Sequence, residues 1–285
     1  MAVENTPKVF KKGYGSNFVI PFAIVLIGSL IIFGVTKMLQ TDRGYKDLVS
    51  ELHSKTFGNR WIAAFELSKV IAAKGIKDED IPWLVDNLNS LYASAVDIRT
   101  KNFIVVTLGA VGNERGVETV LKALEEKDPQ TQFHAIVALS KMNLPSSFDW
   151  SPIMALLSSQ DEGLKQGAIL TLATHRVSMA QDKLVKLLED PSQNIRFASA
   201  TALIYYKDIR ALSVIQKVLN LNAVSTNKKN SLNSDKVYGL KLNILNGLKK
   251  TEWNELAEVV KTYSKKERNL KLVSLSREVL NELNY

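Results

Sequence analysis

The sequence predicts an all-α protein, an α-solenoid of helical hairpins preceded by one transmembrane helix. Two observations support this prediction. A helical pattern of small and apolar residues recurs along most of the chain at intervals of 31 to 42 residues, and an apolar run free of charge lies near the N terminus. Repetition at this period is typical of stacked hairpins, and an apolar run of this length is typical of a membrane span.

The N-terminal residues predict a membrane anchor. Residues 1–17 form a short polar tail with Lys8, Lys11 and Lys12, and the 19 residues Phe18–Thr36 that follow are mostly apolar. As a helix they would span about 28 Å, close to the roughly 30 Å hydrocarbon core of a bilayer. A buried core helix would normally not be apolar on all sides, as this run is. A cleavable signal peptide would be shorter and would have a cleavage site, which this run lacks. We predict a transmembrane helix over residues 18–39.

The basic tail also predicts an orientation. A short tail of lysines before a first span usually stays in the cytoplasm, so residues 40–285 would lie across the membrane. In a bacterium this places the soluble domain in the periplasm, anchored in the inner membrane.

The repeat is best seen around Ile195–Leu203. Asp190-Pro191 ends the preceding helix because proline lacks the amide that helix continuation needs. Apolar and small residues then share one face of the next helix, at Ile195, Ala198, Ser199, Ala202 and Leu203. Similar nine-residue segments occur at Asn59–Leu67, Ile98–Val106, Thr131–Leu139, Leu164–Leu172 and Val237–Leu245. One hairpin cannot bury this face alone, which predicts about six stacked hairpins within residues 40–285.

This motif resembles the HEAT-like repeats of the phycobilisome-lyase type. In that family a first helix ends near Asp-Pro, and the second begins with a hydrophobic residue and arginine and continues into Ala-x-Ala-Leu. The likeness covers roughly residues 45–248, with Lys165 replacing the arginine and Gln132 and Tyr238 departing from it. It implies a fold and no activity. It also implies that these residues brace neighbouring repeats: Arg60, Arg99, Asp190 and Arg196.

The C-terminal part of the chain is basic. Residues 226–285 carry 12 Lys and Arg against 7 Asp and Glu, and a polar stretch at residues 222–236 predicts a loop. We expect the last two helices to form a basic cap that keeps the end of the solenoid soluble. Contact with anionic lipid or an acidic partner is the alternative.

The sequence predicts no enzyme, cofactor or metal site. It has no cysteine, and its three histidines have no metal-binding spacing. Asp78, Glu79 and Asp80 precede Ile81-Pro82, where acidic residues mark the start of a helix. Helix capping is therefore favoured over metal binding.

The third and seventh positions of the nine-residue segments predict a binding surface. They should lie on the concave side of the solenoid, where polar residues are normal, yet many are aromatic or aliphatic. Apolar exposed surface often marks a protein-binding site, although these side chains could instead pack onto the first helix of each hairpin. The third positions are Trp61, Thr100, Phe133, Gln166 and Phe197, and the seventh are Phe65, Ile104, Val137, Leu170 and Thr201. The candidate partner-binding residues are Trp61, Phe65, Phe133 and Phe197.

These observations favour a membrane-anchored, non-enzymatic scaffold or adaptor that binds a protein partner through its concave face. Two alternatives remain open. One is a lyase-like or chaperone-like module acting on a cofactor-bearing protein, as the resemblance allows. The other is nucleic-acid binding through the basic C-terminal region, which requires a cytoplasmic domain and is disfavoured by the predicted orientation. The sequence does not indicate the identity of the partner or the oligomeric state.

Overall fold

The computed structural model describes residues 44–95, 97–221 and 234–284. Every regular element in these ranges is helical, as the sequence predicts. The tail and the transmembrane helix predicted over residues 18–39 lie outside the described residues. Among the helices that are described, none is long and apolar enough to span a bilayer.

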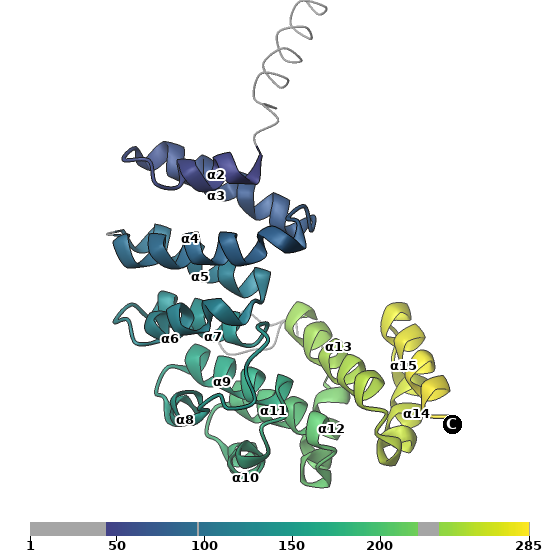
Figure 1. The fold of residues 1–285 in the computed structure, drawn as a ribbon. Coiled ribbons are helices and arrows are strands. Elements are labelled where there is room, and N and C mark those ends of the chain that lie inside the picture. Colours follow the sequence, from purple (N-terminus) through teal and green to yellow (C-terminus); the bar gives the residue numbers. More distant parts are fainter. Residues whose placement is uncertain (1–43, 96, 222–233, 285) are drawn as a thin grey trace, which may run out of the picture.

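The helices form successive antiparallel pairs that stack into a curved solenoid (Figure 1). Six pairs follow one another from the N-terminal end, and a seventh, α14 with α15, completes the C-terminal arm. In chain order the pairs are α2 (Tyr45–Glu51) and α3 (Phe57–Ala72), α4 (Ile81–Ser94) and α5 (Ile98–Val111), α6 (Val117–Leu124) and α7 (Pro129–Leu139), α8 (Ser151–Ala155) and α9 (Glu162–Thr174), α10 (Gln181–Lys186) and α11 (Gln193–Leu203), α12 (Leu212–Leu219) and α13 (Ser234–Thr251), α14 (Ala257–Lys266) and α15 (Leu270–Glu282).

The second helices of the pairs form the inner layer. Consecutive second helices pack directly on one another, from α3 through α5, α7, α9 and α11 to α13. In Figure 1 the C-terminal arm turns back beside this layer, so that α13 faces the side on which α9 and α11 lie. The solenoid therefore has a concave inner face made by second helices.

Aspartate caps fix where several second helices begin. Asp97, Asp128 and Asp161 each accept a hydrogen bond from the backbone amide three residues later, at 2.9, 2.7 and 2.9 Å. Such a cap satisfies an amide that the helix itself cannot bond. The helix after Asp190-Pro191 starts at Gln193, next to Ser192, which agrees with the sequence prediction.

In four of the six segments, the positions equivalent to Ile195, Ser199, Ala202 and Leu203 of the predicted stripe are all buried. In Thr131–Leu139, Leu164–Leu172, Ile195–Leu203 and Val237–Leu245, the first, fifth, eighth and ninth residues are all buried. In Asn59–Leu67 only the fifth and ninth are buried, because this first repeat has no preceding repeat to cover it.

The register predicted for Ile98–Val106 is wrong by two residues. Ile98 and Val106 are exposed, whereas the buried set begins at Thr100, three residues after the Asp97 cap. Ile98 lies in the first helical turn and resembles the hydrophobic start of the motif, which explains the error. The true segment is Thr100–Leu108, and its buried residues are Thr100, Ile104, Thr107 and Leu108.

Small residues bring the second helices close together. A Cβ at Gly109 of α5 would lie 2.6 Å from both Cα and Cβ of Ala138 in α7. A Cβ at Gly167 of α9 would lie 2.5 Å from Cγ2 of Ile136 in α7. Only glycine permits these approaches, which hold the inner layer together.

A buried polar cluster attaches the last pair to α13. Lys241, at the fifth position of its segment, is 7% exposed and donates to Glu267 at 2.7 Å. The Tyr263 hydroxyl also donates to Glu267, at 2.8 Å. Helix α13 begins at Ser234, so residues 234–236 of the predicted loop are helical; residues 222–233 lie outside the described part of the chain.

Candidate protein-binding surface on the inner face

Exposed apolar side chains follow the inner layer from its N-terminal end. Trp61 and Phe65 of α3 are 55% and 54% exposed, and Phe133 of α7 is 42% exposed. Val106 of α5 and Leu170 of α9 are similarly exposed and hold the same seventh position as Phe65 once the register of α5 is corrected. The exposure predicted for Trp61, Phe65 and Phe133 is present in the structure.

Three of the predicted inner-face residues are buried. Phe197 is only 3% exposed, because α11 is enclosed by α9, α10, α12 and α13. Its assignment as an exposed partner-binding residue is wrong. Thr100 and Ile104 are buried because the true segment of α5 begins at Thr100. Its third and seventh positions are therefore Asn102 and Val106.

The aromatic residues of α3 form one stripe. Phe57, Trp61 and Phe65 are four residues apart, so they share a helix face. The Lys69 ammonium lies 4.2 Å from the centre of the Phe65 ring, and the Arg60 and Arg99 guanidinium groups lie 5.8 and 5.5 Å from that of Phe57. Cations over ring faces restrict these side chains without covering them. We call Trp61, Phe65 and Phe133 the aromatic row.

The arginines of the repeat motif brace the turn before their own helix. Arg60 Nη1 donates to the carbonyls of Ser54 and Lys55 at 2.8 and 3.4 Å. Arg196 Nη1 donates to the two equivalent carbonyls, those of Asp190 and Pro191, at 2.7 and 2.9 Å. Both hydrogen-bond partners of Arg196 lie in its own hairpin, so these bonds do not supply the inter-repeat contact predicted for it.

The other motif residues do connect neighbouring repeats. Arg60 Nη2 also reaches Asp97 of the next repeat at 3.2 Å, and Arg99 lies over Phe57 of the preceding one. Asp190 accepts from Lys165 of the preceding repeat at 3.1 Å. Lys101 makes an equivalent bond to Glu126 at 2.6 Å, which the shifted register concealed from sequence analysis. A basic residue at the second position thus binds an acidic residue ahead of the next second helix.

The pKa shifts belong to such structural contacts. The Lys101 ammonium holds the pKa of Glu126 below its usual value, and hydrogen bonds from Arg210 and Gln181 outweigh burial and lower the pKa of Asp208 to about 2. Asp80 precedes α4 as predicted but caps nothing; bonds from Tyr45 and Lys46 of α2 lower its pKa. No cluster of three or more potential metal ligands occurs in the described residues.

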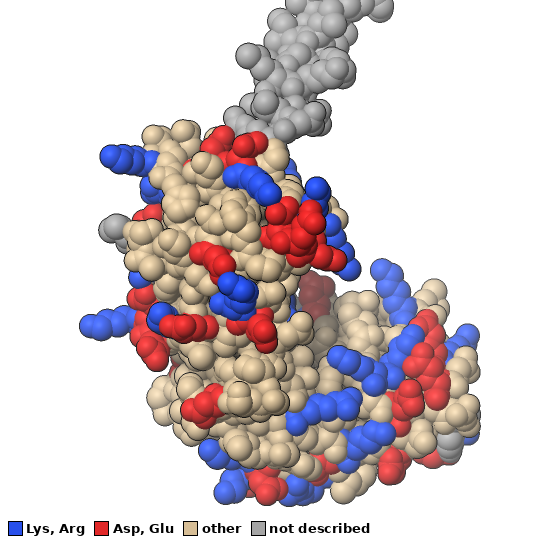
Figure 2. Space-filling view, viewed as in Figure 1, with Lys and Arg blue, Asp and Glu red and all other residues tan. Residues whose placement is uncertain are grey.

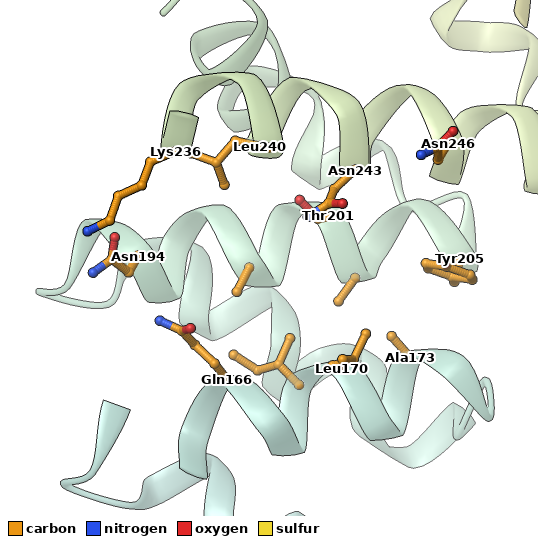
Figure 3. A pocket seen from close by; sticks show the side chains of 14 residues that line it. Gln166, Leu170, Ala173, Asn194, Thr201, Tyr205, Lys236, Leu240, Asn243 and Asn246 are labelled. Atoms are coloured by element: carbon orange, nitrogen blue, oxygen red, sulfur yellow. The ribbon is translucent and has the colours of Figure 1, made fainter. Parts of the chain in front are cut away.

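A groove lies at the other end of the inner face, between α9, α11 and α13. It has a volume of about 680 Å³. In Figure 3 the three helices run side by side in the same direction, with Leu170 and Leu240 between polar side chains. Its lining residues are Gln166, Ile169, Leu170, Ala173, Asn194, Ala198, Thr201, Ala202, Tyr205, Lys236, Gly239, Leu240, Asn243 and Asn246. The groove is not apparent in the sequence because its polar residues come from three repeats.

Charge is distributed unevenly around the concave side. Figure 2 shows many Lys and Arg side chains over the C-terminal arm beside the hollow, with Asp and Glu side chains among them, while the N-terminal repeats show mixed charge and broad uncharged areas. The inner face thus changes from aromatic side chains on α3 to the carboxamide side chains of Asn243 and Asn246 on α13.

Comparison with known proteins agrees with this architecture. Residues 151–231 match the family model for HEAT repeats. The structure of YibA from Escherichia coli superposes with a TM-score of 0.52 at 16% identity, over 86% of this chain and 85% of that one. The complex of CpcE and CpcF of phycocyanin lyase from Nostoc sp. superposes with a TM-score of 0.58 at 16% identity, over 85% of this chain and 95% of that one. No curated protein sequence matches significantly.

These similarities define the fold. The described part of the chain is a HEAT-like repeat solenoid, as its resemblance to HEAT-like repeats implies. At such low identity, the likeness to solved structures extends to the fold alone.

Proposed function

We propose that this protein is a membrane-anchored, non-enzymatic scaffold that binds a protein partner on the inner face of its solenoid. The observation that supports this most directly is the exposure of the aromatic row. Trp61 and Phe65 are more than half exposed on the concave side of a protein whose other large apolar residues are mostly in the core. Aromatic side chains that are held in place but uncovered are typical anchors for protein partners.

The predicted transmembrane helix would hold this scaffold at a membrane. Residues 18–39 end shortly before the first repeat, whose helix α2 begins at Tyr45. A partner bound to the aromatic row would therefore be held by the first repeats after the membrane span. The basic tail supports an extracytoplasmic solenoid, in the periplasm of a bacterium.

A triple variant tests the binding surface. In the full chain in native membranes, Trp61→Ser with Phe65→Ser and Phe133→Ser should release the partner that mild cross-linking captures from the unchanged protein. The matched control replaces three comparably exposed residues elsewhere, with Met179→Ser, Ile209→Ser and Leu270→Ser. Retention of the partner by a folded triple variant would exclude the aromatic row as the binding site.

Reporter fusions test the orientation. An alkaline phosphatase fused after Tyr285 should be active, because this enzyme folds only outside the cytoplasm, and a green fluorescent protein exported through the general secretory route should stay dark. The opposite pair of results would place the solenoid in the cytoplasm. It would also restore nucleic-acid binding as a candidate function.

A lyase-like or chaperone-like role is the second candidate. Its support is the likeness of the fold to the CpcE–CpcF complex of phycocyanin lyase. Co-purification of a chromophore-bearing protein whose chromophore content falls when the solenoid is deleted would favour this role over a passive scaffold.

A further inference from the structure

We propose that the turn between α14 and α15 binds the surface of an anionic phospholipid bilayer, with one leucine inserted among the lipids and the surrounding basic side chains on their phosphate groups. This inference rests on the membrane part of the proposed function, since the predicted anchor would keep the turn close to a bilayer. It adds a second membrane contact, separate from the aromatic row. We call five residues of this turn the basic tip: Lys265, Lys266, Arg268, Leu270 and Lys271.

Leu270 is the apolar residue of the basic tip. Its side chain is 83% exposed, more than any other large apolar side chain in the described part of the chain. It is the first residue of α15, whereas Leu272, two positions later, is 2% exposed and belongs to the core. The Leu270 side chain therefore projects into solvent from the end of the C-terminal arm.

Hydrogen bonds fix the turn that carries Leu270. The Asn269 side chain accepts from two backbone amides in the first turn of α15, at 3.0 and 3.3 Å. The Glu267 carboxylate accepts from the backbone amides of Arg268 and Asn269, at 2.8 and 2.9 Å. Because the turn is already ordered, it would lose little conformational freedom on binding.

The charged side chains of the basic tip are four exposed cations, and they have no carboxylate partner among the described residues. Glu267 does not offset them, because Lys241 and the Tyr263 hydroxyl donate to its carboxylate at 2.7 and 2.8 Å. Asp235, in the first turn of α13, is an exposed carboxylate at the same end of the arm. The cations outnumber it, so the basic tip presents net positive charge.

A lipid surface fits the shape of the basic tip better than a protein does. A protein would need a pocket shaped for the protruding Leu270 and rimmed with carboxylates. A bilayer offers an apolar interior under an anionic surface, and it adapts to a single inserted side chain. Lysine and arginine keep their charges at the level of the phosphates while their methylene groups lie along the apolar part. Charge complementarity and the exposed leucine together select anionic lipid.

The predicted anchor would bring the basic tip to such a surface. Six peptide units separate residue 39, where the predicted span ends, from Tyr45, and they reach about 20 Å at most. In Figure 1 the C-terminal arm turns back, and the end of α15 opposite the marked C terminus points toward the side of the molecule where α2 lies. A curved solenoid held at one end can rest its other end on the same membrane, and tethering fills even a weak site.

The full chain reconstituted in lipid vesicles tests the proposal. The chain has no cysteine, so Ser274→Cys, at an exposed position one turn beyond Leu270, can carry a single fluorescent label. Spin-labelled lipids quench such a label when it lies at the bilayer surface. We expect quenching to be at least about twofold stronger in vesicles of phosphatidylcholine and phosphatidylglycerol in equal parts than in phosphatidylcholine alone, and to weaken as salt is raised. A label at Asn281→Cys, near the other end of α15, is the position control and should be quenched little in either membrane.

Variants connect the quenching to the basic tip. Leu270→Ser should reduce quenching at the Ser274 site in the mixed vesicles to the level seen in phosphatidylcholine alone, and so should replacement of all four cations by glutamine. Ile209→Ser, at another exposed apolar residue, is the control for the leucine. A set of four exposed lysines elsewhere removes the same charge and is the control for the cations: Lys141→Gln, Lys183→Gln, Lys186→Gln and Lys217→Gln. Both controls should leave the quenching unchanged, and circular dichroism should show the same helical content in every variant.

Three outcomes would overturn the proposal. They are equal quenching in the two membranes, quenching that Leu270→Ser leaves unchanged, and quenching that the four glutamine substitutions leave unchanged. If the mixed membrane does not quench the label but soluble polyglutamate binds the chain in detergent through the four cations, the ligand of the basic tip is an acidic protein.

The anchor and the scaffold are tested apart from the basic tip. A chain that stays in the vesicles through an alkaline wash but shows no dependence on phosphatidylglycerol would refute the tip and leave the anchor standing. A chain that the wash removes but that shows this dependence would refute the anchor alone. Leu270→Ser in the control of the cross-linking experiment should not release the partner, because residues 18–39 would still hold the chain in the membrane.

Discussion

Single residues at the contacts between second helices decide how tightly the solenoid packs. Gly109 lets α5 reach α7 so closely that the position of an added Cβ would overlap Ala138. In the sequence Gly109, Gly112 and Gly116 lie together between two helical patterns, but in the structure only Gly112 ends a helix, with a φ of 70°. A glycine in a helix that serves packing and one that ends a helix look the same in a sequence.

A pair of glycine variants separates packing from helix propensity. Gly109→Ala should lower the free energy of unfolding by about 1 to 3 kcal/mol, because α5 and α7 must move apart. Gly239→Ala in α13 should raise it by up to about 1 kcal/mol, because its Cβ meets nothing and alanine favours the helix. Urea unfolding of the full chain in detergent, followed by circular dichroism, measures both. Equal effects of the two variants would refute the close approach of α5 and α7.

The buried carboxylate of Glu267 predicts a dependence on pH. Burial raises the pKa of Glu267, but hydrogen bonds from Lys241, the Asn269 amide and Tyr263 outweigh it and lower the pKa to about 2. The folded pKa lies below the unfolded value of about 4.5. The ionised group therefore stabilises the fold fully above about pH 4.5, and this stabilisation is lost as the pH falls toward 2.

Glu267→Gln tests this dependence. At pH 7 it should lower the free energy of unfolding by about 3 kcal/mol, because Lys241 is left buried without a charge partner. The difference from the unchanged chain should shrink as the pH falls below 4.5. Lys241→Met combined with Glu267→Leu should recover most of the stability at pH 7. A difference that does not change with pH would show that Glu267 is not ionised in the fold.

At the scale of the helices, hairpin pairing was predictable from the sequence and side-chain exposure was only partly so. The Asp-Pro break predicts the start of α11 correctly, and four of the five residues of its apolar stripe are buried, whereas Ala198 is half-buried and lines the groove. The signal that would have corrected α5 was present, because Asp97 precedes Thr100 by three residues as Asp128 precedes Thr131. The burial of Phe197 was not predictable from its position, since it depends on four helices around α11.

Asp97 has two structural roles, one in its own helix and one in the contact with the preceding repeat, and substitutions can test each role. It caps α5, and it accepts a bond from Arg60 of the preceding repeat. Asp97→Ala should lower the free energy of unfolding by about 2 kcal/mol, with about 1 from the cap and the rest from the ion pair. Asp97→Asn should cost about half as much, because asparagine keeps the cap but carries no charge for the ion pair. Asp161→Ala, which removes a cap that has no ion pair among the described residues, is the control.

If Asp97→Asn and Asp97→Ala are equally destabilising, the cap contributes nothing and the register of α5 depends on packing alone. Hydrogen exchange of the first amides of α5 gives an independent measurement. Loss of the cap should speed exchange there and leave the first turn of α9 unchanged.

At the scale of the whole molecule, stacking gives one continuous surface two different chemistries. Each second helix contributes the same positions to the inner face, yet those positions hold Trp61 and Phe65 at one end and Gly239 and Asn243 at the other. A solenoid can vary its surface in this way because each repeat needs to match only its neighbours. The buried core positions are small or aliphatic apart from Lys241, whereas the inner-face positions vary widely.

The same nearest-neighbour packing predicts how damage spreads. Ala202 is buried in α11, which packs against α9 and α13. Ala202→Asp would place a carboxylate in an apolar contact and should cost roughly 3 kcal/mol or more. Because repeats contact only their neighbours, hydrogen exchange should accelerate most in α9, α11 and α13 and least in α3.

Thr201→Asp, at the adjacent half-buried position on the inner face, is the control and should leave exchange in α9 nearly unchanged. Uniform acceleration from α3 to α15 would show that the solenoid unfolds as one cooperative unit, and equal effects of the two variants would refute the packing assigned to Ala202.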